Sequence, residues 1–363
     1  MANMANRFFA INTEATYATP IVSALKYGEV DDESFAPNFD IMTRSDISRY
    51  GPRKTVIGME TSGGDVSWAM LGDEFTNKLI ANTWNKGTTT GSSAPYTHTL
   101  EEDSATSDQK AAVANNIYKG TNSLTVVVGR EGRTHRYKGQ SLNSLTISAN
   151  VGEYVMCSAS FLGCGEAVDS AGGTNEFIVA DGATGGAPAD TVFHDNDAFH
   201  FEGAHIAFEG GAETANDRSG LVKSVELTFN LNRDTDSAVA LGNNSYTRAP
   251  VPGMREITGS IEFNRAMNAA DVADDEPFFK ELAAGLTVVG TATAPALSVQ
   301  YNGATNEALL IDIYSLQYDA PDSTISGRDR QTLKVSFTAL YNEATSCMSK
   351  AIITSTKSAS PFA

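Results

Sequence analysis

The sequence is poor in cysteine and tryptophan and has no long apolar run. Only three cysteines (Cys157, Cys164 and Cys347) and two tryptophans occur in 363 residues. Three cysteines are too few for a disulfide framework, so we expect buried thiols in a protein made in a reducing cytosol. No run of about 18 apolar residues is present, and no transmembrane helix is therefore predicted. The N-terminus also lacks the basic and apolar regions of a secretory signal.

Basic residues are scarce as well. The chain has 26 Lys and Arg against 44 Asp and Glu, a formal net charge of 26 − 44 = −18. A surface that grips nucleic acid needs clustered cations to neutralise phosphates, so the charge argues against that activity. The densest basic segment, residues 130–136, is short, and we interpret it as an exposed hairpin end. DNA could still pass this protein without adhering to it.

Alternation of apolar and polar residues with a period of two dominates the chain. In residues 222–231, apolar side chains at Val225, Leu227 and Phe229 alternate with polar ones, which is typical of a half-buried antiparallel strand. Short strands separated by Gly, Asn and Asp predict a mainly β fold, a sandwich or a barrel. The same pattern recurs in 124–128, 145–149, 155–161, 257–263, 297–301 and 333–339.

Two segments have a helical pattern. Residues 69–84 carry apolar side chains at helical spacing, from Leu71 through Phe75 to Trp84. Residues 274–285 open with acidic residues and a proline and close with glycine, which are start and stop signals of a helix. We therefore expect one flanking helix in each half of the chain.

The two halves repeat the same order of elements, which predicts two tandem β domains over 1–190 and 191–363. In this interpretation Gly58 corresponds to Gly259, Leu124 to Leu297, and Phe161 to Phe337.

The first half is the longer one, and its extra residues fall in polar segments. We expect a long surface loop or arm over 86–122, a connector over 167–190, and a C-terminal arm after about residue 346.

Motifs of catalysis are missing from the sequence. It contains no Walker A loop, GxGxxG turn, HExxH helix or GxSxG elbow. One cluster of imidazoles and carboxylates lacks the compact spacing of a metal site, so we interpret it as strand edges and turns. We predict no catalytic, cofactor or metal site. The cluster consists of His194, Asp195, Asp197, His200, Glu202 and His205.

Two other functions remain open at this point. The first is a β-sandwich surface module that binds carbohydrate, which would use exposed aromatic residues. Trp68 and Trp84 lie at and within the first predicted helix, where packing in the core is the expected role. The second is an acidic sandwich hydrolase, which would need two carboxylates that converge in a cleft.

Three parts of the chain carry a family resemblance. The first is the opening E-A-T-Y-A-T-P over residues 14–20, and the second is the strand 53–58 that precedes the helix of 69–84. The third consists of residues 223–230 and 255–262 of the second half. In these segments the chain resembles the tail tube, or major tail, proteins of long-tailed bacteriophages, in the form with two tube domains in one chain.

The resemblance implies a structural virion protein without catalytic activity. Family members polymerise into stacked rings around a lumen that conducts DNA during ejection. A duplicated chain would form a trimer with pseudo-sixfold symmetry, and residues 86–122 would contact the next ring. The implied partners are further copies, the tape-measure protein, the tail terminator, and baseplate or distal tail proteins. The implied location is the tail of a siphovirus-type virion assembled in the host cytoplasm, although the sequence leaves a contractile tail open.

The acidic balance suits a DNA conduit. Three chains would carry 3 × −18 = −54 formal charges per ring, and carboxylates on the lumen would repel phosphates. The candidates for lumen-facing residues are Glu226 and Glu262, on the polar faces of two predicted strands.

Overall fold

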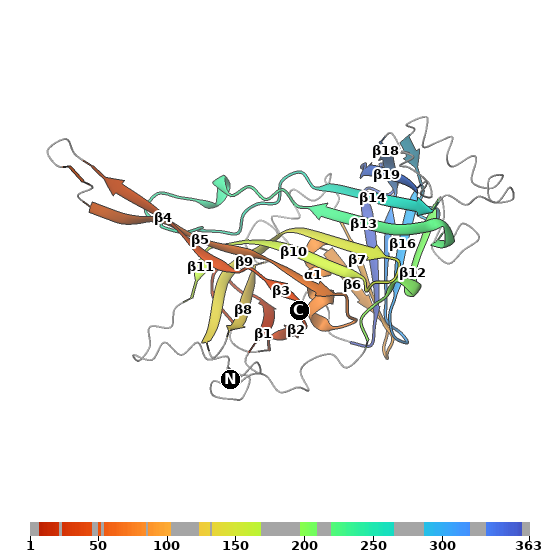
Figure 1. Ribbon diagram of the computed structural model, residues 1–363, viewed down its shortest axis with the longest axis horizontal. Helices are drawn as coiled ribbons and strands as arrows, with labels where there is room; N and C mark the ends of the chain where they lie inside the picture. Colours follow the sequence, from red (N-terminus) through yellow and green to blue (C-terminus); the bar gives the residue numbers. More distant parts are fainter. Residues whose placement is uncertain are drawn as a thin grey trace.

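The structure is a computed structural model, and it is mainly β with antiparallel strand pairing (Figure 1). One α-helix, α1 (Glu74–Trp84), lies in the described part of the chain. The described residues are 7–21, 24–45, 50–51, 54–84, 86–102, 123–130, 133–167, 197–208, 219–264, 287–319 and 332–357.

Two sheets form the body of the molecule. The larger sheet consists of β1 (Phe8–Thr13), β2 (Lys26–Gly28), β3 (Asp32–Glu33), β4 (Ala36–Arg44), β5 (Lys54–Ala69), β8 (Leu124–Arg130), β9 (Arg133–Asn150), β10 (Met156–Gly163), β11 (Gly165–Glu166), β13 (Val222–Asn230), β14 (Glu256–Asn264), β15 (Thr287–Val289), β18 (Ser315–Tyr318) and β19 (Thr332–Ala339). Its main order is β15-β18-β19-β14-β13-β9-β10-β5-β3. The smaller sheet has the order β12-β16-β17-β20-β7-β6. Its strands are β6 (Lys86–Thr90), β7 (Tyr96–Glu101), β12 (Ala204–Phe208), β16 (Leu297–Asn302), β17 (Ala308–Ile313) and β20 (Ser349–Ser355).

The core contains apolar side chains from both sheets and from α1. Trp84 of α1 lies against Phe229 of β13, with ring centroids 4.8 Å apart, and both rings are fully buried. Three short 3-10 turns are also described: η3 (Phe201–Gly203), η4 (Ser219–Leu221) and η5 (Asp236–Ala238). This arrangement confirms the predicted sandwich of apolar strand faces.

The predicted helix over 69–84 exists but begins five residues later. The backbone N–H of Thr76 donates to the carboxylate of Asp73 at 2.7 Å, which is the contact of an N-cap residue. Residues up to Ala69 remain extended because β5 pairs with β10 along its whole second part. The second predicted helix, 274–285, lies outside the described residues.

The same strand order occurs in both halves, but the repeat is offset from the predicted one. In the first half β10 pairs with β5 and β9, and in the second half β19 pairs with β14 and β18. Phe161 lies opposite Gly64, and Phe337 lies opposite Gly259. The counterpart of Gly259 is therefore Gly64 and not Gly58.

Two segments predicted as loops or arms are strands. Residues 86–101 of the expected 86–122 loop form the β6–β7 hairpin, and the tail after 346 contributes β20, which lies between β17 and β7. Residues 103–122 and the connector after residue 167 lie outside the described residues.

Both sheets combine strands from the two halves. In the larger sheet β13 pairs with β9 over Ser224–Asn230, and in the smaller sheet β20 pairs with β7. The predicted boundary at residue 190 lies outside the described residues. The two halves are thus joined by main-chain hydrogen bonds as well as by the chain itself.

Candidate assembly surfaces

The larger sheet has one face that is almost entirely polar. On β13 the buried Val225 and Leu227 face the core, so Glu226 and Thr228 lie on the opposite side. Strand register aligns eight polar residues across eight strands of this face, and we call them the hydroxyl row. They are Ser67, Ser158, Thr146, Thr228, Thr258, Thr338, Gln317 and Thr287.

The eight residues of the hydroxyl row carry no charge, but the row ends beside Asp32 of β3, which lies opposite Ser67. Carboxylates also lie on both sides of the row. Asp65 and Glu256 belong to the neighbouring row on one side, where they align with Ser160, Ser144 and Asn230. Within the row, the hydroxyls of Thr146 and Thr228 hydrogen-bond at 3.1 Å. The face therefore offers hydroxyls flanked by acidic groups, together with the exposed Lys334, which lies opposite Glu262.

The two sequence candidates, Glu226 and Glu262, lie on the other side of the hydroxyl row and on the same face. Glu226 is exposed and lies opposite Ser260, whereas Glu262 accepts an ion-pair contact from Lys223 at 2.8 Å. Lys223 thus pairs with the carboxylate of Glu262 and not with that of Glu226. Their place on a lumen stays a prediction.

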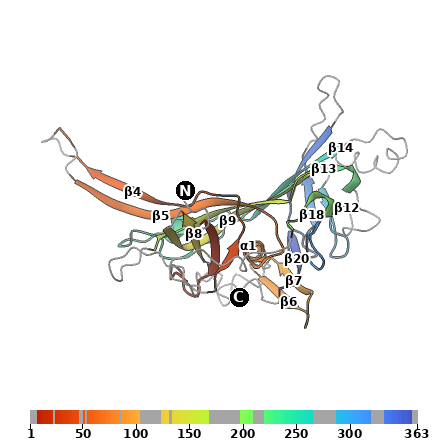
Figure 2. The same ribbon diagram turned by 60° about the horizontal axis from the view of Figure 1, so that its bottom comes forward.

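Strands β4 and the first part of β5 form an arm that extends beyond the body of the molecule (Figure 2). In the described part of the chain β4 pairs only with β5, so its outer edge is open. Apolar side chains on the arm are exposed, which is unusual for a strand of a soluble monomer. They are Phe39, Ile41, Met42, Val56 and Ile57, with Tyr50 at the tip.

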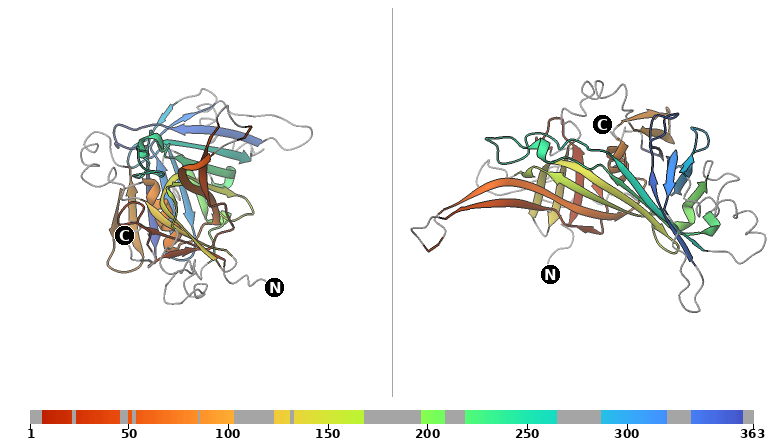
Figure 3. Two further views of the ribbon diagram at one scale, coloured as in Figure 1. Left: turned by 90° about the vertical axis from the view of Figure 1, so that its left-hand side faces the viewer. Right: turned by 90° about the horizontal axis from the view of Figure 1, so that it is seen from above.

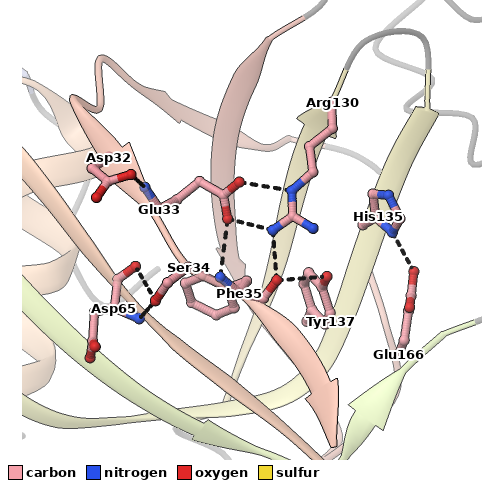
Figure 4. Close-up of polar contacts among 9 residues, drawn as sticks. All are labelled: Asp32, Glu33, Ser34, Phe35, Asp65, Arg130, His135, Tyr137 and Glu166. Atoms are coloured by element: carbon pink, nitrogen blue, oxygen red, sulfur yellow. Dashed lines mark hydrogen bonds and ion pairs between the residues drawn. The ribbon is translucent and has the colours of Figure 1, made fainter.

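A polar network fixes the base of the arm (Figure 4). The guanidinium of Arg130 donates to both carboxylate oxygens of Glu33, at 2.8 and 2.6 Å, and to the carbonyl of Phe35 at 2.6 Å. The hydroxyl of Tyr137 donates to the same carbonyl at 3.2 Å. This bidentate pair raises the pKa of Arg130. Since Phe35 directly precedes β4, the network sets the direction in which the arm leaves the body.

Near this network, two further polar contacts tie neighbouring strands together. His135 Nδ1 lies 2.8 Å from the carboxylate of Glu166, and the backbone N–H of Asp65 donates to the hydroxyl of Ser34 at 2.8 Å (Figure 4). The basic segment 130–136 therefore holds the base of the arm in place. Its interpretation as a merely exposed hairpin end is incomplete.

The segment between β13 and β14 folds back over the first half of the chain. Arg233 donates to the carbonyl of Leu142 on β9 at 2.5 Å and to the carbonyl of Pro250 at 2.9 Å. Burial and the neighbouring Arg255 lower the pKa of Arg233 to about 10. The backbone N–H of Glu60 on β5 donates to the carbonyl of Asn244 at 2.5 Å. This segment, residues 232–254, thus docks on a surface of the same chain.

The opening segment that carries the resemblance is anchored by a buried carboxylate. Glu14 is 1% exposed and accepts hydrogen bonds from Ser123 (2.6 Å), Thr125 (2.9 Å) and the backbone N–H groups of Gly139 (2.9 Å) and Ala18 (2.8 Å). Burial raises its pKa, although these four donors oppose that shift. The carboxylate therefore fixes the turn after β1 on β8 and β9.

The other chemical candidates occupy structural positions. His200 forms an isolated bridge with Tyr154, and His205 lies in β12, whereas His194 and Asp195 are outside the described residues. Among the residues that the structure describes, no three His, Cys, Asp or Glu side chains are grouped as metal ligands would be.

The three cysteines are free and buried, as expected from the sequence. Burial raises the pKa of Cys164 to about 11, and it also raises the pKa of Cys157 and Cys347, which disfavours the reactive thiolate. Trp68 and Trp84 are fully buried, which confirms their role in the core.

No described helix has the length and apolar character needed to cross a bilayer. No curated protein matches the chain. A family model described as phage tail tube protein matches residues 4–339, which is nearly the whole chain. The chain therefore belongs to the phage tail tube protein family and is a structural component of the virion tail.

Proposed function

We propose that the chain assembles head to tail into rings of three subunits, and that the rings stack into the tail tube. The observation that carries this proposal is the internal repeat: each half contributes the same strand order to one sheet, and β13 of the second half pairs with β9 of the first. One junction of the repeat is therefore formed within the chain. Three chains would supply six repeats, joined by three internal and three intermolecular junctions.

The two ends of the larger sheet suit such a junction. At one end β4, the counterpart of β13, has an open outer edge in the described structure. At the other end, the short strand β15 pairs with the outer edge of β18, which is the counterpart of the part of β9 opposite Phe161. In the described structure β15 in turn has an open outer edge. Open strand edges favour pairing with a further strand, and a closed ring leaves none exposed. This continuous sheet is the feature that would define the lumen.

We further propose that the polar face of the larger sheet lines the lumen. Hydroxyls offer a passing duplex no cation to bind, and the flanking carboxylates repel phosphates. Replacing Glu226 and Glu262 with Lys should leave tubes intact but retard DNA ejection, because the lumen would then hold phosphate-binding cations. Tubes that eject DNA at the wild-type rate would contradict the lumen assignment.

The remaining parts of the proposal concern partners and place. The tube would enclose the tape-measure protein and end on terminator and baseplate or distal tail proteins. Assembly would take place in the host cytoplasm, in a siphovirus-type tail, and the subunit would catalyse no reaction. The measurement is the composition of purified tails and the length of tubes formed when each partner is omitted.

The first experiment is negative-stain electron microscopy of the purified chain at rising concentration, with native mass measurement alongside. We expect hollow tubes and a species of three times 38.5 kDa. If only monomers are present, tail-tip complex is added as an initiator. Continued failure to polymerise with that initiator would contradict the proposed function.

A further inference from the structure

The second half of the chain exposes a small apolar patch at its end. Val289 on β15 pairs with Ser315, and the backbone N–H of Leu340 donates to the carbonyl of the same Ser315 at 2.9 Å. Val289, Leu340 and the adjacent Tyr341 are 69, 37 and 46% exposed. We call these three residues the end patch. Aromatic and aliphatic side chains gathered at a sheet end are typical of a contact surface.

The first half buries the corresponding place. Because Phe161 corresponds to Phe337, Cys164 and Gly165 occupy the positions of Leu340 and Tyr341. Cys164 is 1% exposed, whereas Leu340 is exposed. The two halves thus differ in what covers this corner of the sheet.

In the first half, residues 232–254 of the second half reach this corner through Glu60. Asn244 accepts the hydrogen bond from Glu60, and the Glu60 carboxylate lies beside Gly165. The segment between β13 and β14 therefore lies against this corner within the chain.

The counterpart of that segment in the first half is the arm. Gly64 corresponds to Gly259, so residues 40–59 of the arm correspond to residues 232–254 between β13 and β14. The two segments are similar in length. Residues 232–254 fold back on their own chain, but the arm leaves the body (Figure 3), and its described apolar side chains are exposed.

We propose that the arm of one copy docks on the end patch of a second copy, in the way that residues 232–254 lie against the Cys164 corner within one chain. The inference rests on the proposed function and identifies the surfaces that would join neighbouring subunits of one ring. The arm and the end of the second half lie at opposite ends of the long axis (Figure 1). Each copy therefore carries one arm and one patch, and the contact is head to tail, the kind of contact that forms a ring when its rotation closes.

The test uses a charge on each surface. Ile57→Glu alters the arm and leaves the patch intact, and Tyr341→Glu does the reverse. Both residues are exposed, so the variants should fold, which circular dichroism and the urea midpoint check.

Each variant alone should stay monomeric under conditions in which the wild type forms rings. Mixed in equal amounts, the two variants should form a 1:1 dimer and no ring. The intact arm of Tyr341→Glu can dock on the intact patch of Ile57→Glu, but the other arm and the other patch are both altered. Val151→Glu is the matched control, since Val151 is exposed to the same 58% as Ile57.

Several outcomes would overturn the docking. Rings of normal size from either variant would do so, and so would a mixture that yields no dimer. Rings from Ile57→Glu that fail only to stack would assign the arm to contacts between rings instead. Wild-type protein that stays monomeric even with tail-tip complex would count against the proposed function itself, and the docking would fall with it.

Discussion

Arg255 and Glu102 form an ion pair between the two halves of the chain, with guanidinium nitrogen and carboxylate oxygen 3.3 Å apart and side chains only 13 and 10% exposed. Glu102 also accepts hydrogen bonds from the backbone of Met348 (3.0 Å) and from the hydroxyl of Ser349 (2.6 Å). Arg255 donates in addition to the carbonyl of Thr83 at the end of α1. One carboxylate and one guanidinium thus connect β7, β20, β14 and the helix.

Glu102→Gln should lower the free energy of unfolding by about 3 kcal/mol, because it leaves the buried guanidinium without a counter-charge. Urea unfolding measures the loss. Glu101→Gln is the neighbouring control, since Glu101 pairs with Lys350 at 3.5 Å with side chains 45 and 29% exposed. An exposed pair of this kind contributes about 0–1 kcal/mol. Equal losses in the two variants would show that the halves are not held by the buried pair.

Gly64 and Gly259 are the corresponding glycines of the two halves. At both positions neighbouring atoms approach the backbone so closely that a side chain has no room. A methyl group at Gly259 would lie 2.7 Å from the carbonyl oxygen of Glu226 and would enter the ring of Phe337, and one at Gly64 would lie 2.6 Å from the Cα of Phe35. Alanine at either position should cost about 1–3 kcal/mol, because the backbone on the far side cannot move away. Gly220→Ala is the control, since nothing lies within 4 Å of the added methyl. A neutral Gly259→Ala would contradict the tight packing.

His98 makes stability depend on pH. Its Nε2 lies 3.2 Å from the carbonyl of Lys357 and so carries the proton, and its Nδ1 accepts from Thr89 at 2.9 Å. Burial lowers the pKa of His98 below 6.5, so the unfolded chain takes up its proton at a higher pH than the folded one. Stability is therefore full above about pH 6.5 and falls as the pH drops below that value. The urea midpoint of wild type should fall between pH 7 and pH 5 more steeply than that of His98→Gln, and parallel slopes would refute this origin.

Arg130 should control the arm and hence assembly. Arg130→Met removes the bidentate pair with Glu33 and the contact to the carbonyl of Phe35. We expect faster hydrogen exchange over residues 33–44 and a higher protein concentration for ring formation. Lys at this position should not restore the wild type, because an ammonium group cannot match both carboxylate oxygens in one plane. Lys223→Met provides the comparison, since it breaks the more exposed pair with Glu262.

Much of the fold follows from period-two alternation where the buried positions are strongly apolar. Val225, Leu227 and Phe229 define β13 in this way. Strand β20 escapes the same reasoning because two of its buried positions are Ser349 and Ser355, which hide the pattern. Their hydroxyls accept hydrogen bonds from Trp84 at 3.0 Å and from Asn77 at 3.3 Å, contacts made with residues far away in the sequence.

The surfaces were harder to predict than the core. The polar face could be read from the strands, and both Glu226 and Glu262 lie on it. The sequence analysis does not predict the arm, but its sequence signal is the adjacent apolar pairs Ile41–Met42 and Val56–Ile57. Adjacent residues of a strand point to opposite faces, so each pair places an apolar side chain on both faces of its strand. A half-buried strand of a monomer packs only one face on the core, so apolar residues on both faces indicate a further contact surface. The offset between Gly58 and Gly64 arose because glycine alone does not fix a register.

The main-chain junction between β13 and β9 has a consequence for the concentration at which rings form. In a ring of the proposed kind, every second junction closes when a single chain folds, without a collision between molecules. Only three bodies then lose translational and rotational freedom instead of six. The effective concentration of one half beside the other is set by the connecting chain. Ring formation should therefore depend on the third power of subunit concentration, which favours assembly early in an infection, while the protein is still dilute.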